Sequence, residues 1–112
     1  MIKMGRKTLK FRDYLIKPIL SGEKDVTWRL FDEKNISVRD EVDLINWNTK
    51  EKFGEAIIIN VREKKMGDLI ESDFEGHEKF ANREEMYNKS RVYYGNKIGA
   101  DTMVKIFRFK LK

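Results

Sequence analysis

The stretch AIIINV at residues 56–61 constrains the fold more than any other part of this chain. It is almost wholly apolar and rich in β-branched side chains, a composition typical of a strand that is covered on both faces. We therefore expect residues 53–62 to form the central strand of a β-sheet.

The neighbouring strands are predicted from the alternation of apolar and polar residues. Val42 and Leu44 alternate with acids in residues 41–47, as in a half-buried strand, and residues 48–51 have the composition of a hairpin turn. Further strands are expected over residues 8–11, 24–30 and 102–112. One face of the last strand is predicted to carry Met103, Phe107, Phe109 and Leu111, and the other Val104, Ile106, Arg108 and Lys110.

Helices are expected over residues 12–21, 66–71 and 82–95. Gly22 is placed as the C-terminal stop of the first helix. Asn82 is able to cap the third helix by accepting from the backbone of Glu85, and Gly95 ends that helix. Five or six strands with two or three short helices predict an α+β fold, namely a small, mostly antiparallel β-barrel decorated by helices.

Composition excludes several classes of protein. The chain has 112 residues, enough for one domain that spans residues 1–112, and it has no cysteine for disulfides or thiolate metal sites. Its apolar runs are far shorter than the roughly 18 residues of a membrane-spanning helix. Residues 1–11 lack the apolar core of a secretory signal. We therefore expect a cytoplasmic domain that does not enter a membrane.

Positive charge gathers at both ends of the sequence. Residues 1–17 carry six basic side chains against one acid, and residues 103–112 carry four bases and no acid, whereas residues 63–85 carry eight acids against four bases. With a net charge of +5, a basic face formed by the two ends would suit a polyanion such as nucleic acid. A solvated, salt-bridged surface of the kind found in thermophile proteins explains the same pattern, so charge alone leaves both interpretations open.

Residues suited to metal or triad chemistry are scarce. The single histidine, His77, has Glu75 and Glu78 nearby but no second histidine or cysteine, so we interpret it as a surface or network residue. The sequence also lacks a Gly-x-Ser-x-Gly elbow and a glycine-rich phosphate loop. It therefore predicts neither a metal nor another cofactor.

Residues 20–30, LSGEKDVTWRL, combine polar and aromatic groups directly after a turn. On a strand, Thr27 and Arg29 project to one face, while Trp28 projects to the other and is expected in the core. Lys24 lies near the turn, so alternation does not fix its direction. An arginine beside a hydroxyl can bind phosphate or a base edge, and a lysine beside a threonine can activate it as a nucleophile. An ordinary exposed strand has the same pattern.

Residues 19–29 resemble the sequence pattern of the ASCH domain, a branch of the PUA-like superfamily. That pattern has a helix, then Gly-x-Lys, a hydroxyl residue and an arginine on the first barrel strand. The corresponding residues here are Gly22, Lys24, Thr27 and Arg29. The similarity continues to the closing strand at residues 104–109, covers nearly the whole chain and is greatest to small archaeal members. It implies a PUA-like β-barrel with a cleft between the barrel and its helices.

The resemblance also implies a function. Family members are proposed to bind RNA or a modified nucleoside, and one bacterial branch hydrolyses the acetyl amide of N(4)-acetylcytidine with a lysine, a threonine and a glutamate. Lys24 and Thr27 match the first two, and the glutamate, which relays protons, corresponds to either Glu75 or Glu78. One departure is Asp25, which stands where a threonine is common and adds a negative charge able to pair with Lys24 or Arg29.

We therefore predict an RNA- or modified-nucleoside-binding domain. Its ligand-binding residues are expected to be Tyr14, Lys24, Thr27, Arg29, Arg39 (where the family usually has glycine), Trp47, Arg108 and Lys110. Tyr14 or Trp47 would stack on a base. In the alternative, a small amidohydrolase acting on acylated cytidine, Thr27 is the nucleophile and Lys24 the base. A protein-interaction domain with a vestigial cleft is the third hypothesis.

Overall fold

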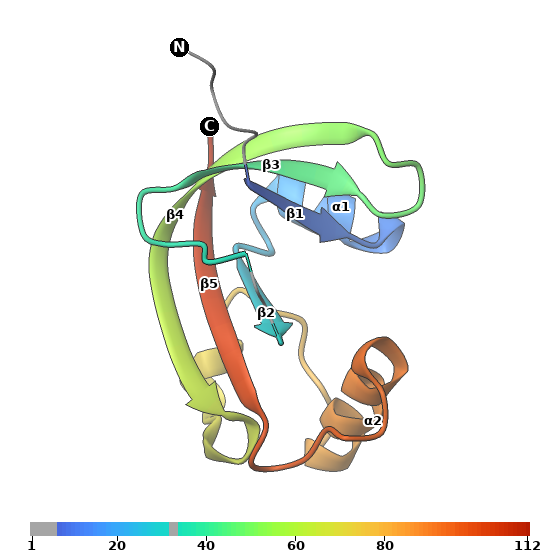
Figure 1. Cartoon of the computed structure of the whole chain (residues 1–112). Helices are drawn as coiled ribbons and strands as arrows, with labels where there is room; N and C mark the ends of the chain where they lie inside the picture. The colour runs from blue at the N-terminus through green and yellow to red at the C-terminus, as the bar shows by residue number, and fades with distance from the viewer. Residues whose placement is uncertain (1–6, 32–33) are drawn as a thin grey trace.

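The isoleucine-rich stretch lies in the middle strand of a five-stranded sheet, as predicted. The computed structural model describes residues 7–31 and 34–112, and its sheet has the order β1-β3-β4-β5-β2 (Figure 1). The strands are β1 (Lys7–Phe11), β2 (Val26–Leu30), β3 (Glu41–Asn46), β4 (Lys52–Lys65) and β5 (Met103–Leu111). Because β4 extends beyond both ends of residues 53–62, it pairs with β3 over its first half and with β5 over most of its length.

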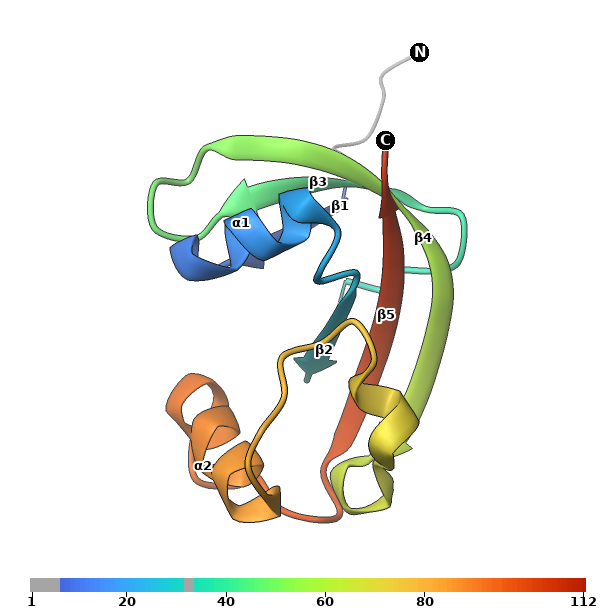
Figure 2. The same ribbon diagram turned by 180° about the vertical axis from the view of Figure 1, so that it is seen from behind.

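The sheet curls into a half-barrel rather than closing completely. Three of its four strand pairs are antiparallel, and only β1 and β3 run parallel. Figures 1 and 2 show the long, curved β4 and β5 forming the back of the half-barrel. Within the described residues no ladder joins β1 to β2, so these two strands are the open edges of the sheet. The predicted α+β fold with a mostly antiparallel barrel is thus confirmed, with one open side.

Two α-helices flank the open side, α1 (Asp13–Ser21) and α2 (Arg83–Tyr94). As predicted, α1 ends at Gly22, whose φ of 88° is favourable for glycine. Also as predicted, Asn82 caps α2, and its side chain accepts a hydrogen bond from the Glu85 N–H at 2.9 Å. The predicted helix over residues 66–71 is wrong. Two 3₁₀ turns, η1 (Met66–Asp68) and η2 (Glu71–Phe74), replace it.

The reason for the interrupted helix is a buried carboxylate. Asp73 has no exposed side-chain surface and accepts from the Ile70 N–H at 2.8 Å, which starts a new turn instead of continuing the first. Its other partners are Arg62 and Lys64, at 2.6 and 2.7 Å, so two strand cations neutralise it. The turn is therefore attached to β4.

Two hydrophobic clusters lie on opposite faces of the sheet. The cluster inside the half-barrel includes Ile58, Phe107 and Phe109, and the cluster outside it includes Val104 and Ile106 beneath the 3₁₀ turns and α2. The predicted division of the last strand into two faces is consistent with this arrangement. The expectation that residues 56–61 are covered on both faces is wrong, because the ladder to β5 shifts register between Ile58 and Asn60 and leaves Ile59 46% exposed. None of the helices in the described part of the chain has both the length and the apolar content needed to cross a bilayer.

Candidate functional site

A cavity of about 460 Å³ is lined by residues of β1 and β2 and of the two α-helices. The basic residues that line it are Lys10, Arg12, Lys24, Arg29, Lys34, Lys79 and Lys89. Among the described lining residues only one, Glu78, is acidic. The cavity therefore has a strongly positive potential, which favours an anionic ligand.

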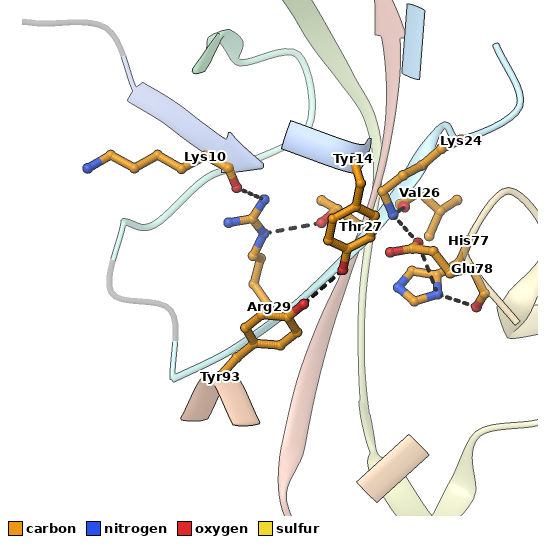
Figure 3. A network of polar contacts seen from close by, with 9 residues as sticks. All are labelled: Lys10, Tyr14, Lys24, Val26, Thr27, Arg29, His77, Glu78 and Tyr93. Carbon is orange, nitrogen blue, oxygen red and sulfur yellow. Dashed lines mark hydrogen bonds and ion pairs between the residues drawn. The ribbon is translucent and has the colours of Figure 1, made fainter. Parts of the chain in front are cut away.

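One wall of the cavity comes from the inward face of β2. Thr27 is 4% exposed, and its hydroxyl accepts a hydrogen bond of 3.1 Å from Arg29 Nε (Figure 3). The same guanidinium donates to the Lys10 carbonyl at 2.8 Å and lies 4.8 Å from the centre of the Phe11 ring. Since Lys10 and Phe11 belong to β1, the Arg29 side chain bridges the two open edges of the sheet.

Lys24 is held at the start of β2 by two short contacts. Its amine donates to the Val26 carbonyl at 2.7 Å and to Glu78 Oε2 at 2.5 Å, and the residue is only 4% exposed. Burial lowers the pKa of Lys24, an effect that the Glu78 charge partly opposes. Burial alone would raise the pKa of Glu78, but the charges of Lys24 and His77 and the hydrogen bonds to the carboxylate together outweigh it and leave that pKa below its usual value. The two residues thus form an ion pair in the cavity wall.

Gly76 explains how Glu78 reaches β2 from a distant part of the chain. The Gly76 carbonyl accepts from the N–H groups of Asp25 and Val26, at 3.0 and 3.1 Å. Its φ is +76°, and an added Cβ would lie 1.8 Å from an Asp25 carboxylate oxygen, so only glycine fits. This contact places the two residues that follow, His77 and Glu78, against the cavity.

His77 is a site residue that the sequence did not reveal. Its ring stacks on Trp28 with centroids 4.0 Å apart and an angle of 14°, and its side chain is 8% exposed. Nδ1 lies 2.7 Å from the backbone oxygen of Glu78. Burial and the Lys24 charge lower the pKa of His77 to about 4, so the ring is neutral at pH 7. Nδ1 must then carry the proton that is donated to the carbonyl, and Nε2 presents a lone pair.

The mouth of the cavity is aromatic and basic. The hydroxyls of Tyr14, on α1, and Tyr93, on α2, lie 2.8 Å apart and join the two helices (Figure 3). Burial and this hydrogen bond raise the pKa of Tyr14 to about 12. The Arg12 guanidinium lies 4.8 Å from the Trp47 ring and 5.1 Å from the Tyr93 ring, and Trp47 is 40% exposed. A planar ligand entering the cavity would meet these rings first.

The structure brings together some of the expected site residues and separates others. Tyr14, Lys24, Thr27, Arg29, Trp47 and Glu78 all line the cavity, and the expectation that Trp28 is in the core is confirmed by its 8% exposure. Glu75, Arg39, Arg108 and Lys110 are not among the lining residues, and Asp25 pairs with Arg108 at 3.2 Å instead of with Lys24. Lys3 and Arg6, which contribute to the predicted basic face, lie outside the described residues.

Two signals could have pointed to His77 and Glu78. The sequence places the only histidine directly after a glycine and directly before an acid. The contact with β2, however, joins residues about 50 positions apart in the chain, as the spacing of 54 between Lys24 and Glu78 shows. In residues 7–31 and 34–112 no three histidine, cysteine or acidic side chains are grouped closely enough to hold a metal ion.

The fold of this chain is similar to that of solved ASCH domains. The ASCH domain of Lactobacillus crispatus matches with a TM-score of 0.70 and 17% identity, over 88% of this chain and 70% of that one. The ASCH protein of Zymomonas mobilis matches with a TM-score of 0.67 and 13% identity, over 92% and 65%. A DUF984 protein of Enterococcus faecalis matches with a TM-score of 0.75 and 12% identity, over 99% and 82%. No model of a protein family matches the sequence, and neither does any curated protein.

Proposed function

We propose that the cleft binds RNA through an unpaired nucleotide, or binds a modified nucleoside. The observation that carries this proposal is the ratio of seven basic residues to one acid among the described residues that line a cavity of about 460 Å³. Ligand pockets usually have volumes of about 300–1,000 Å³, so a nucleotide fits. The cations supply attraction for phosphate, and most of the affinity for single-stranded RNA arises in this way.

The two parts of the cleft suit the two parts of a nucleotide. At the mouth, Arg12 and Lys10 lie beside the exposed Trp47 ring, where a phosphate and a neighbouring base would both find partners. Deeper in the cleft, Lys24 and Thr27 are almost completely buried and offer hydrogen bonds rather than open charge. A base would therefore enter the cavity, and its backbone would remain at the mouth.

The test is the salt dependence of binding to a fluorescently labelled single-stranded RNA. The logarithm of the affinity should fall linearly with the logarithm of the salt concentration, with a slope of about 0.7 per phosphate contacted. Arg12→Ala should weaken binding and reduce that slope by about 0.7, because it removes one contact at the mouth. Lys110→Ala is the matched control, because Lys110 is exposed and lies outside the cavity lining. Binding that ignores salt, or an equal loss in both variants, would contradict a cleft for RNA.

A second candidate function is supported by the contact between Lys24 and Glu78. Thr27 lines the same cavity, so the chain has a hydroxyl, a buried amine and a carboxylate in one wall. Lys24 would first pass a proton to Glu78 and would then, as a neutral amine, accept the hydroxyl proton of Thr27 while Thr27 Oγ attacks the acetyl carbonyl of N(4)-acetylcytidine. The protonated Glu78 would donate its proton to the departing amine of cytidine. Water would then release acetate from the acyl-threonine. Glu78 takes the relay role here because Glu75 lies outside the lining.

Incubation with N(4)-acetylcytidine tests this activity directly. Cytidine and acetate should appear in equal amounts, and Thr27→Val, which keeps the shape of the side chain, should abolish their release. Release that persists in Thr27→Val, or no release above the buffer rate by the wild type, would eliminate the hydrolytic mechanism. The RNA-binding proposal does not depend on this result.

A further inference from the structure

Three polar side chains follow one another along the wall of the cleft: Lys24, Glu78 and His77. The amine of Lys24 lies 2.5 Å from Glu78 Oε2, which in turn lies 3.5 Å from His77 Nδ1. Figure 3 shows Glu78 between the other two, with the second ring nitrogen of His77 turned away from the Glu78 backbone oxygen. All three line the cavity. A ligand in the cleft therefore meets them in this order.

Each of the three groups keeps one hydrogen-bonding position for a ligand. The ammonium of Lys24 has three protons, of which the Val26 carbonyl and Glu78 take two. Glu78 Oε1 and His77 Nε2 are hydrogen-bonded to no other residue in the part of the chain that the structure describes. The wall thus offers a donor, then an acceptor, then a second acceptor.

The complement of this wall is a ligand edge with an acceptor followed by two donors. The Watson–Crick edge of guanine has this order, because O6 accepts and both N1–H and the N2 amino group donate. Uracil presents an acceptor at the third position, where its oxygen would face the lone pair of His77. Cytosine presents a donor first and then two acceptors, the reverse of what the wall requires. Adenine has an amino donor where the Lys24 amine needs an acceptor.

We propose that the cleft recognises an unpaired guanine base, with O6 bound by Lys24, N1–H by Glu78 and the N2 amino group by His77. This inference rests on the proposed binding of RNA or a nucleoside and names the base. Selectivity would arise from the cost of a mismatch, because a buried acceptor that faces another acceptor loses its hydrogen bond and gains repulsion.

The surroundings of His77 keep its acceptor nitrogen in place. The ring is packed flat on Trp28, and its Nδ1–H donates to the Glu78 carbonyl. A flipped ring, or the tautomer with its proton on Nε2, would lose this hydrogen bond. The lowered pKa agrees with a ring that stays neutral at pH 7. His77 is therefore the residue that distinguishes guanine from uracil and hypoxanthine, whereas Lys24 and Glu78 discriminate against cytosine and adenine.

The experiment compares single-stranded RNA heptamers of adenosine whose central base is guanine, hypoxanthine, cytosine or uracil. Hypoxanthine is guanine without the N2 amino group, so it removes only the partner of His77. The wild type should bind the guanine oligomer most tightly and the hypoxanthine oligomer about tenfold more weakly, the value of one well-formed hydrogen bond in a buried site. In His77→Phe, which keeps a ring stacked on Trp28, the two oligomers should bind equally.

The controls separate this inference from the proposal on which it rests. Glu75→Gln alters an acid in the same segment that lies outside the cavity lining, and it should leave the ratio of guanine to hypoxanthine affinity unchanged. Tight binding of all oligomers with no preference for guanine would overturn the guanine inference and leave RNA binding intact. The same would follow if His77→Phe weakened both oligomers equally. No binding of any oligomer would overturn both. The ratio in the wild type is informative even if His77→Phe does not fold.

Discussion

A proton on His77 should destabilise the folded protein. The pKa of His77 falls from 6.5 to about 4, first because the ring is buried and second because Lys24 carries a positive charge nearby. Between these pH values the unfolded chain binds a proton that the folded protein does not, so the free energy of unfolding decreases as the pH falls. The stability associated with the neutral ring is complete above pH 6.5 and is lost by about pH 4. This difference in pKa corresponds to about 3 kcal/mol.

His77→Phe isolates this contribution. Phenylalanine keeps a ring against Trp28 and cannot bind a proton, whereas the acids with lowered pKa, such as Asp40 and Asp73, titrate in both proteins. Urea unfolding should therefore be compared between pH 7 and pH 4. The stability of the wild type relative to the variant should decrease by up to about 1.4 kcal/mol for each pH unit below pH 6. Since the chain has one histidine, a proton NMR titration of its ring gives the folded pKa without assignment.

The refuting result is a constant difference in stability across this range, together with a ring that titrates near pH 6.5. It would mean that His77 accepts a proton as easily in the folded protein as in the unfolded chain. The ring would then be accessible to water, and Nε2 would not be a fixed acceptor in a buried wall. The argument for guanine recognition would lose its third contact.

Three other substitutions test the contacts around the site. Glu78→Gln should lower the free energy of unfolding by about 2 kcal/mol, because it leaves the buried Lys24 amine without a counter-charge. The control Glu75→Gln should change it by less than about 0.5 kcal/mol. Equal urea midpoints for the two variants would contradict the ion pair. Asp73→Asn should cost about 3 kcal/mol, since the carboxylate is fully buried and binds two cations, and thermal unfolding at neutral pH would show it. Phe31→Gly should raise the free energy of unfolding by about 1 kcal/mol, because Phe31 is 63% exposed and has a φ of 56°, which glycine adopts without strain. A lower melting temperature in the variant would mean that the contact of Phe31 with Tyr94 stabilises the protein more than the backbone strain destabilises it.

The parts of the fold that were predictable from the sequence depend on local patterns. A continuous apolar run located the central strand, and alternating apolar residues located its neighbours, to within a few positions. Gly22 and Asn82 marked helix ends through their own backbone and side-chain preferences. The helix over residues 66–71 was predicted wrongly because its interruption depends on Asp73. That carboxylate is buried by Arg62 and Lys64, which β4 supplies, and the effect is tertiary rather than local.

The candidate site was predictable only on the strand that carries most of it. Thr27 and Arg29 share a face because strand geometry requires it, and Lys24 was expected near them because it lies at the turn that precedes them. The choice between Glu75 and Glu78 could not be made, since the two are three positions apart in an irregular segment. What decides it is the contact of the Gly76 carbonyl with two N–H groups near the start of β2, a long-range hydrogen bond that no local pattern encodes.

The cleft exists because the sheet does not close into a full barrel. Residues of the site hydrogen-bond to backbone groups of β1 and β2 that these two strands would otherwise share in a closed barrel. An open sheet edge has backbone groups in need of partners. Here the Lys24 amine binds the Val26 carbonyl on β2, Arg29 binds the Lys10 carbonyl on β1, and Gly76 accepts from the N–H of Val26. Pairing β1 directly with β2 would satisfy the same groups and remove the cavity. Substitutions of Lys24 or Arg29 should therefore affect stability and binding together. The His77 side chain hydrogen-bonds to no backbone group of β1 or β2, so it is the position at which recognition can change while the half-barrel stays intact.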